Sequence, residues 1–405
     1  MDLRTEGRIL YISDADVSVG YGPGVNENEF IHAMHEAVGD RADFLVPRPL
    51  EPVDDLPQHL LHFCQPHHRY NPLRYPMHVA SQLRAAQRLL REHHFDLLVF
   101  RLGVLPLVSR SLVRRHRIPY AIKTLGTGPL EVLHHRGGWL GKALASPNRS
   151  MFRDLVAGAL VADTDSQGHA AALRQRLDSD HEQIVWIDNG VNTRRFYPGP
   201  AAAARRELGL GDAHPVIGYV GSRPWERGGT QLIEAGARLV DTYPGLAIVI
   251  VGAGEPVEDM RRRASELGIA ERCHFAGYVP YRMIPRYVQS LDVGVSISLP
   301  PERAMNSELK VRQYLAAGRP VVISPGSNEF VSEEKLGTVV APDDIEAITE
   351  ALSFWLSLPG PERATFERRA AAYMDEHLSM GAMITRRLVL WGERMKRSVQ
   401  TAPAG

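Results

Sequence analysis

The sequence predicts an α/β protein with two doubly wound parallel sheets, and two observations lead to this prediction. The chain has 405 residues, which is more than one hydrophobic core usually serves, so two domains of roughly 180 to 200 residues are expected. Short apolar runs alternate with helix-length segments, and the alternation restarts after Phe-Tyr-Pro-Gly-Pro at residues 196–200. Because strands that alternate with helices form parallel sheets covered on both faces, each half is predicted to hold one sheet, with a hinge at the Pro-Gly-Pro stretch.

The first predicted domain covers residues 1–195. Its helix-length segments include residues 26–38, 76–91 and 166–177. Its strand-like runs are residues 8–12, 43–46, 96–100, 120–124, 159–162 and 183–187. Their length and their apolar character are typical of strands buried inside a parallel sheet.

The second predicted domain covers residues 200–378. Its strand-like runs are residues 216–220, 246–251, 272–275, 292–297, 320–323 and 337–340. A helix is predicted over residues 230–240, after the first of these strands. An amphipathic stretch at residues 380–398 follows without another strand, and we expect it to form a helix that packs back on the first domain.

Composition excludes several classes of function. The 47 basic and 47 acidic residues give a formal net charge of zero, so nothing drives the whole chain toward nucleic acid or an anionic membrane. Cys64 and Cys273 are far apart and form no Cys-x-x-Cys pair, which argues against a disulfide scaffold and a thiolate metal site. No basic stretch followed by an apolar run opens the chain, and no apolar segment approaches the ~20 residues that span a bilayer. We expect a cytoplasmic protein; membrane contact is not indicated, and the oligomeric state stays open.

The segment at residues 306–324 is the most informative, since it predicts a helix start packed against a buried strand. Asn306 or Ser307 can cap the helix, and Gly318 can end it. Lys310 lies in the first turn, where a cation is misplaced unless an anion lies beyond the helix end. The segment therefore predicts a phosphate site.

A second candidate phosphate loop follows the strand at residues 216–220. It is bracketed by glycines and carries Arg223 and Arg227, whose guanidinium groups bind phosphate oxygens in a bidentate fashion. The alternative is a solvated loop in which these arginines pair with Glu226 or Glu234.

Two further glycine pairs and one histidine cluster are candidates for ligand or metal binding. Gly252 and Gly254 resemble part of a dinucleotide fingerprint, but its third glycine and its closing acidic residue are missing, which disfavours nicotinamide binding and leaves a tight turn as the alternative. Gly22 and Gly24 follow the first strand and precede a helix, where glycine lets a ligand approach the backbone; a plain turn is the alternative. No metal site is expected from the cluster of His59, His62, Cys64, His67 and His68, since its spacing matches no standard zinc site.

Several motifs occur in an order that resembles the retaining GT-B glycosyltransferases of family 4, also called group 1. The motifs are Asp-Asn-Gly-Val-Asn-Thr-Arg-Arg-Phe-Tyr-Pro at residues 188–198, Val-Gly-Ser-Arg at 220–223 with Arg-Gly at 227–228, Val-Gly-Ala-Gly-Glu-Pro at 251–256, Val-Pro at 279–280 and Tyr-Leu-Ala-Ala-Gly-Arg-Pro-Val-Val at 314–322. The resemblance implies a GT-B architecture, in which two Rossmann-like domains face one another across a cleft. It also implies a nucleotide diphosphate sugar of the UDP or GDP type on the second domain and an acceptor on the first.

The resemblance further implies roles for individual residues. Arg227 stands where the family usually has lysine, and Lys310 matches the lysine of members that read Ser-Pro-x-Lys-x-x-Glu-Tyr; both would stabilise the departing diphosphate and act as the catalytic cations. No metal or other cofactor is then needed. The other donor-binding residues implied are Gly22, Gly24, Ser222, Arg223, Gly252, Gly254, Val279, Ser307, Glu308, Leu309 and Gln313. The candidate acceptor-binding residues are Asn26, Lys123, Thr124, Gly126 and His134.

The sequence departs from the family pattern on the donor side. Where many members have a Glu-x7-Glu pair, this chain has Met305 and Gln313. Gln313 can still hydrogen-bond ribose hydroxyls. Glu302 and Glu308 are candidates for the missing role near the sugar.

The sequence also departs from the pattern on the acceptor side. Leu125 stands where a family strand often ends in histidine. Either Lys123 or Thr124 faces the acceptor instead, or the acceptor needs no such contact; the structural alternative is that Leu125 is packed under the loop. His134 lies in a basic and aromatic stretch that can touch lipid or an anionic acceptor, although an ordinary loop over the acceptor site is the simpler reading.

We therefore predict a retaining glycosyltransferase that moves a sugar from a nucleotide diphosphate donor to an unidentified small-molecule or glycan acceptor. One alternative is a pseudo-glycosyltransferase or nucleotide-sugar-processing enzyme of the same fold. The other is a non-catalytic subunit that binds a nucleotide sugar.

Overall fold

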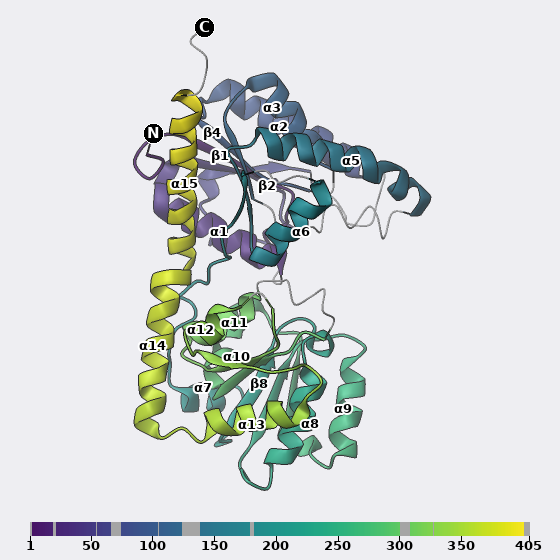
Figure 1. The fold of residues 1–405 in the computed structure, drawn as a ribbon, viewed down its shortest axis with the longest axis vertical. Helices are drawn as coiled ribbons and strands as arrows, with labels where there is room; N and C mark the ends of the chain where they lie inside the picture. Colours follow the sequence, from purple (N-terminus) through teal and green to yellow (C-terminus); the bar gives the residue numbers. More distant parts are fainter. Residues whose placement is uncertain are drawn as a thin grey trace. The chain divides into compact units, whose positions relative to one another are not determined.

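The computed structural model describes residues 2–18, 22–53, 55–65, 74–103, 105–123, 138–178, 182–299, 308–326 and 328–400. The chain divides into two compact units, one made of Met1–Asp188 with Met383–Gly405 and the other of Asn189–Ala382. We call them unit 1 and unit 2. Each unit holds one parallel sheet with helices packed around it (Figure 1). The predicted α/β class with two doubly wound sheets is confirmed.

Unit 1 is built on a seven-stranded sheet with the order β3-β2-β1-β4-β5-β6-β7. Its strands are β1 (Ile9–Ser13), β2 (Ala42–Pro47), β3 (Leu61–Cys64), β4 (Leu97–Arg101), β5 (Tyr120–Lys123), β6 (Val161–Thr164) and β7 (Ile184–Trp186). Its helices are α1 (Pro23–Val38), α2 (Arg74–Glu92), α3 (Leu107–His116), α5 (Gly138–Gly158), α6 (Gln167–Leu177) and α15 (Met380–Gln400), whose first turn belongs to unit 2. Strand order reverses between β1 and β4, so the crevice for a ligand is expected at the carboxyl ends of these strands.

Unit 2 is built on a six-stranded sheet with the order β10-β9-β8-β11-β12-β13. Its strands are β8 (Val216–Val220), β9 (Ala247–Val251), β10 (Cys273–Gly277), β11 (Val293–Ser296), β12 (Val321–Ile323) and β13 (Gly337–Val339). Its helices are α7 (Ala201–Glu207), α8 (Gly229–Leu239), α9 (Val257–Glu266), α10 (Ile284–Ser290), α11 (Leu309–Ala316), α12 (Phe330–Glu333), α13 (Ile345–Leu356) and α14 (Gly360–Leu378). Short 3-10 turns in this unit are η3 (Pro224–Glu226), η4 (Ala270–Arg272) and η5 (Tyr281–Met283), and those in unit 1 are η1 (Gly39–Arg41) and η2 (Gln58–Leu60). Here the strand order reverses between β8 and β11.

Three features of the structure differ from the sequence interpretation. Strand β3 was not predicted, because His62 and the neighbouring prolines mask its short apolar alternation. Strand β6 begins at Val161 and reaches Thr164, two residues beyond the predicted run, because the charged Asp163 is buried as part of the strand. The boundary between the units falls after Asp188, upstream of the Pro-Gly-Pro stretch.

The C-terminal helix α15 packs on unit 1, as predicted. It buries Met383, Ile384, Leu388 and Trp391. Arg387 on the same face is also buried, and its Nε donates a 2.8 Å hydrogen bond to Asp163 Oδ2 at the end of β6. Arg387 Nη2 donates to the carbonyl oxygens of Ile187 and Asp188 at 3.1 and 3.4 Å. One buried guanidinium therefore joins α15, β6 and the chain that follows β7.

We expect Arg387→Met to lower the free energy of unfolding by about 3 to 5 kcal/mol, because it leaves the Asp163 carboxylate buried without its cation. The neighbouring Arg386 is exposed, so Arg386→Met is the matched control and should change stability by less than about 0.5 kcal/mol. Denaturant unfolding, followed by a probe in unit 1, measures both. If both variants lost the same free energy of unfolding, the buried pair of Arg387 with Asp163 would not be important for stability.

Candidate functional site

The candidate site in unit 2 lies where the strand order reverses, at the carboxyl ends of β8 and β11. Ligands of doubly wound sheets bind at such points. Three segments meet there: the loop after β8 carries Arg227, the end of β11 and the loop after it carry Ser296 and Ser298, and the start of α11 carries Glu308 and Lys310. We call these five residues the Glu308 cluster.

Glu308 is the centre of this cluster, and both of its carboxylate oxygens are bonded. Oε1 accepts from Arg227 Nη1 and, at 2.7 Å, from Ser298 Oγ. Oε2 accepts from Ser296 Oγ and, at 3.1 Å, from Lys310 Nζ. Four donors therefore occupy the roughly four lone-pair positions of a carboxylate.

The two cations determine the ionisation of Glu308. Burial by itself raises the pKa of this carboxyl group, but the charges of Lys310 and Arg227 and the two serine hydroxyls lower the pKa to about 2. The Glu308 side chain is 6% exposed, and those of Arg227 and Lys310 are 12% and 16% exposed. Glu308 is thus a carboxylate at neutral pH, held in a largely dry environment by two positive charges.

Lys310 lies in the first turn of α11, as the sequence predicted. Its Nζ lies 5.4 Å from the centroid of the Tyr219 ring. A Cβ atom at Gly221 would lie 2.8 Å from Lys310 Cε and 2.7 Å from the Tyr219 hydroxyl. Gly221 therefore leaves the space through which the lysine side chain reaches Glu308.

The predicted capping of this helix is wrong. The helix begins at Leu309, and its N-cap is Glu308, which has an extended backbone and makes no capping hydrogen bond with its side chain. The reason is that the Glu308 carboxylate turns toward the cations instead of the first helical N–H groups. Asn306, Ser307, Met305 and Glu302 lie outside the described residues.

The two arginines of the loop after β8 have different environments. Arg227 contacts Glu308 and Ser298, and its carbonyl oxygen accepts a 3.1 Å hydrogen bond from the Ile297 N–H group. Arg223 has a side chain that is 58% exposed and pairs with Glu226 at 3.1 Å. The solvated-loop alternative therefore describes Arg223 and not Arg227.

The glycine pair in the loop after β9 allows close packing of this loop. Gly252 and Gly254 have φ angles of 143° and 155°. A Cβ atom on Gly252 would lie 2.6 Å from Pro224 Cδ and overlap the Gly221 carbonyl oxygen, and one on Gly254 would lie 2.6 Å from the Trp225 ring. These glycines let the loop after β9 support the loop that carries Arg227.

The remaining donor-side residues take varied positions in unit 2. Ser222 is exposed, Leu309 is half-buried, and Val279 and Gln313 are buried. Ser296 and Ser298 were missed by the sequence interpretation. Their signal was available, because two hydroxyl residues two positions apart at the carboxyl end of a buried strand point to the same side.

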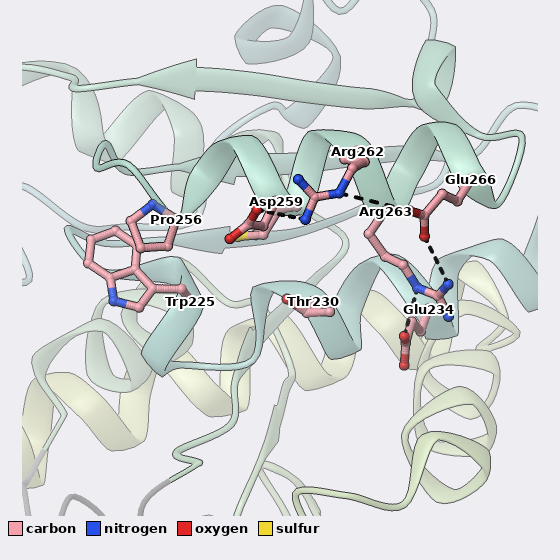
Figure 2. Close-up of a pocket in the computed structure, with 9 residues that line it drawn as sticks. Trp225, Thr230, Glu234, Pro256, Asp259, Arg262, Arg263 and Glu266 are labelled. Carbon is pink, nitrogen blue, oxygen red and sulfur yellow. Dashed lines mark hydrogen bonds and ion pairs between the residues drawn. The ribbon is translucent and has the colours of Figure 1, made fainter.

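A groove of about 390 Å³ lies between α8 and α9, beside the Trp225 ring. Figure 2 shows that charged side chains from both helices line it. Arg263 pairs there with Glu234 at 3.0 Å and with Glu266 at 3.3 Å, and Arg262 pairs with Asp259 at 2.7 Å. Because each of these charges has a partner within the groove, the groove is an ordinary junction of two solvated helices.

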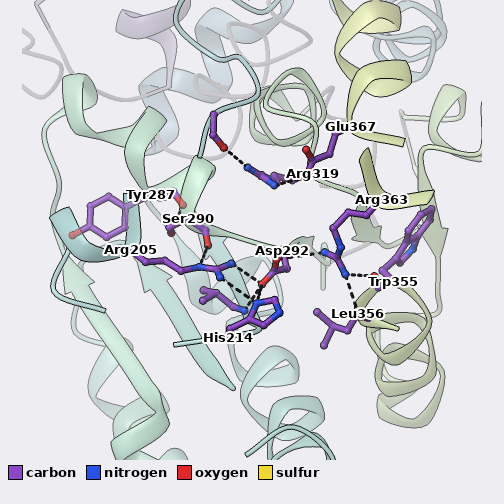
Figure 3. Close-up of polar contacts among 12 residues, drawn as sticks. Arg205, His214, Tyr287, Ser290, Asp292, Arg319, Trp355, Leu356, Arg363 and Glu367 are labelled. Atoms are coloured by element: carbon purple, nitrogen blue, oxygen red, sulfur yellow. Dashed lines mark hydrogen bonds and ion pairs between the residues drawn. The ribbon is translucent and has the colours of Figure 1, made fainter. Parts of the chain in front are cut away.

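A second buried ionic group lies near the amino ends of β8 and β11 and holds the fold (Figure 3). Asp292 accepts hydrogen bonds from Arg205 Nη2 at 2.6 Å and from the Val216 N–H group at 2.7 Å. Arg363 of α14 reaches the same carboxylate at 3.4 Å. The end of a parallel sheet opposite to the ligand edge is where a structural network is expected, and we assign no binding role to it.

Unit 1 has its own buried charge cluster at the carboxyl edge of its sheet. Lys123 ends β5, is 1% exposed, and has its Nζ 3.5 Å from Glu27 Oε2 and 4.4 Å from the centroid of the Phe30 ring. Arg101 Nε lies 3.3 Å from the same Glu27 oxygen. Burial lowers the pKa of Lys123 to about 8, against the opposing effects of Glu27 and Asp163. The ammonium is directed into the interior, which does not support a direct acceptor contact.

The other first-unit candidates are placed in part. Gly22 has a φ angle of 50° and directly precedes α1, and Gly24 and Asn26 are buried in the first turns of that helix. Thr124, Leu125, Gly126 and His134 lie outside the described residues. Glu27 was missed, although an acidic residue near the start of the first helix, facing a lysine and an arginine at neighbouring strand ends, is a recognisable pattern.

The histidines near β3 have carboxylate or sulfur neighbours. His59 lies 3.0 Å from Asp40, and His62 lies 2.8 Å from Asp43. Cys64 lies 3.9 Å from His78 Nδ1. In the described part of the chain, no group of three or more His, Cys, Asp or Glu side chains is placed to hold a metal ion; His67 and His68 fall outside that part.

No helix among the described residues combines the length and the apolar character that crossing a membrane requires.

Comparison with known proteins finds a family model that matches part of unit 2. Residues 214–357 match the sequence model of the family described as "Glycosyl transferases group 1". A GDP-mannose-dependent alpha-(1-6)-phosphatidylinositol monomannoside mannosyltransferase of Mycolicibacterium smegmatis is 37% identical over 194 residues, which cover 45% of this chain and 47% of the relative. The chain spans about half the length of the curated relatives it matches.

Solved structures show the fold of the whole chain. A sucrose-phosphate synthase from Thermosynechococcus elongatus superposes with a TM-score of 0.72 at 18% identity, covering 98% of this chain and 100% of that one. The Anabaena protein Alr3699/HepE, solved in complex with UDP and glucose, superposes with a TM-score of 0.67 at 17% identity, covering 98% and 100%. The two sheets thus have the GT-B type of fold, as predicted.

If Gly252 serves packing, Gly252→Ala should lower the free energy of unfolding by about 2 to 4 kcal/mol, since overpacking adds to backbone strain. Gly268 is the matched control, because its φ angle is 71° and no atom lies within 4 Å of an added Cβ. Gly268→Ala should cost only about 1 kcal/mol of strain. Denaturant unfolding of unit 2 measures both, and equal costs would refute the packing role.

Proposed function

We propose that this chain, whose second unit carries the group 1 glycosyltransferase sequence, transfers a sugar from a nucleotide diphosphate donor to an acceptor. One observation carries the proposal: Arg227 and Lys310, from separate segments, converge at the point of unit 2 where the strand order reverses. Two cations brought together at that edge of a doubly wound sheet are suited to a diphosphate.

The chemistry follows from the charge that develops on the leaving group. When the bond between the sugar and the diphosphate breaks, negative charge grows on the phosphate oxygen, and preorganised cations lower the energy of that transition state. Each unit-charge contact near 4 Å is of order 4 kcal/mol at an effective dielectric of ~20. Arg227 and Lys310 would supply this stabilisation without a metal ion, with the N–H groups at the start of α11 beside them.

The proposed donor is a sugar carried by UDP or GDP. Support comes from the relative named as GDP-mannose-dependent and from the Anabaena structure named as a complex with UDP and glucose. Val279 and Gln313 are the proposed neighbours of the base and the ribose. Gly22 and Gly24 would approach the donor phosphates, and unit 1 would bind the acceptor.

Retention of the sugar configuration is proposed on family resemblance and one structural argument. Within the described residues of the Glu308 cluster, the single carboxylate is Glu308, and four donors occupy it. It is therefore a poor base for the acceptor hydroxyl. In the front-side path, a new bond forms between the acceptor oxygen and the anomeric carbon, the bond to the phosphate oxygen breaks, and that phosphate takes the acceptor proton.

Isothermal calorimetry with UDP, GDP and ADP sugars tests the first step of this proposal. We expect binding of a UDP or GDP sugar and its consumption when cell extract supplies an acceptor, with the product anomer read by NMR. If no nucleotide binds, the enzyme proposal fails. Binding without slow hydrolysis or consumption would favour a non-catalytic subunit, and a product without a glycosidic bond would favour a pseudo-glycosyltransferase.

Lys310→Ala should weaken nucleoside diphosphate binding by about tenfold to a hundredfold, the value of one charge-assisted hydrogen bond, and leave nucleoside binding nearly unchanged. Lys335 is exposed in the same unit, so Lys335→Ala serves as the control and should leave both affinities alone. Calorimetry with GDP, UDP and the free nucleosides measures the difference. Equal losses for both ligands would contradict the phosphate role of Lys310.

A further inference from the structure

The Glu308 cluster contains one anion placed between the two cations that the proposed donor needs. Arg227 Nη1 contacts one oxygen of Glu308, and Lys310 Nζ contacts the other. We propose that Glu308 is an internal counter-anion, which competes with the donor diphosphate for Arg227 and Lys310 and so limits the affinity of the site for nucleotide. This inference rests on the proposed function.

The charge balance of the cluster is the first argument. Arg227 and Lys310 contribute two positive charges and Glu308 one negative charge, so the cluster has a net charge of one positive unit. All three side chains are at least four-fifths buried, and solvent screens their interactions weakly. A diphosphate that approaches the same two cations therefore meets the repulsion of the carboxylate as well as their attraction.

The hydrogen bonds of Glu308 give the second argument, because they exclude the alternative role. The sequence left open that Glu308 contacts the transferred sugar. Both oxygens are already bonded to Arg227, Ser298, Ser296 and Lys310, so a sugar hydroxyl would have to displace one of these donors. The geometry is that of a carboxylate whose partners are cations of the protein and not the sugar.

The third argument concerns how the carboxylate is held. The hydroxyl groups of Ser296, which ends β11, and of Ser298, two residues later, also donate to Glu308, so two of its four donors carry no charge. A phosphate can therefore draw the cations toward itself while the carboxylate stays in place. An anchored counter-anion favours release of the nucleoside diphosphate product, a step that often limits turnover.

Glu308→Gln tests the proposal, because it removes the negative charge and keeps the shape and one carbonyl acceptor. We expect GDP or UDP to bind at least about tenfold tighter than to the wild-type protein, which corresponds to one charge contact. Free guanosine and uridine should bind as before. The gain should shrink at high salt, and Glu308→Asp, which keeps the charge, should show little gain.

Two further variants make the result specific. Glu255 is an exposed carboxylate on the loop after β9, at the same edge of the sheet, and Glu255→Gln should change nucleotide affinity by less than about twofold because its charge is screened. In the Lys310→Met background, Glu308→Gln raises the cluster from zero net charge to one positive unit. The double variant should then bind GDP or UDP tighter than Lys310→Met alone, and it avoids two uncompensated buried cations if the single variant folds poorly.

The outcomes separate this inference from the function on which it rests. If the wild-type protein binds a nucleoside diphosphate but both Glu308→Gln variants bind it no tighter than their parents, the counter-anion role is overturned. If the wild-type protein binds no nucleotide, the proposed function itself fails. A gain of affinity cannot come from damage to the fold, so a purely structural role of Glu308 predicts the opposite sign.

Discussion

The architecture of the candidate site depends on one buried carboxylate that holds two cations together. Arg227 and Lys310 belong to segments that are separated by more than eighty residues in the sequence, and without Glu308 their like charges would repel each other in a poorly screened environment. The carboxylate makes it favourable for the two cations to lie close together. The hydroxyl groups of Ser296 and Ser298 hold this carboxylate where the strand order reverses. The glycines around the site follow from this arrangement: Gly221 leaves room for the lysine stem, and Gly252 lets the next loop pack behind.

Unit 1 also contains buried carboxylates that are paired with cations. At the carboxyl edge of its sheet, Glu27 faces Lys123 and Arg101, and Asp163 faces Arg387 of α15. A buried ion pair contributes little net stability compared with apolar packing, but removing one partner is costly. Of these pairs, the one between Asp163 and Arg387 joins the last helix to the first sheet.

Apolar periodicity was enough to predict most of the fold, and charge explains the exceptions. The strand of Val216–Val220 was predicted at its observed bounds, because the uncharged run Val-Ile-Gly-Tyr-Val ends at Gly221. Strand β6 was placed too early because Asp163 resembles a strand end until its partner Arg387 is known, and that partner lies 224 residues away in the sequence. The start of α11 was also predicted at the wrong residue. A capping rule uses only neighbouring residues, so it could not predict that the Glu308 carboxylate bonds to Arg227, which is distant in the sequence. Arg227, Lys310 and Glu308 could all be selected from the sequence, whereas the pairing of Glu308 with both cations could not.

The choice of arginine at position 227 and lysine at position 310 suits the geometry of the site. Arg227 extends from a loop, and its planar guanidinium carries five N–H donors in a fixed fork, of which one nitrogen serves both Ser298 and Glu308. Lys310 extends from the first turn of a helix, past Gly221 and the Tyr219 ring, and its ammonium can move on a flexible stem. If both cations turn from the carboxylate to a phosphate and back, as we propose, the site would bind and then release the same anion. If Glu308 is the counter-anion that we propose, the charge of a single side chain would set how strongly this site holds a nucleotide.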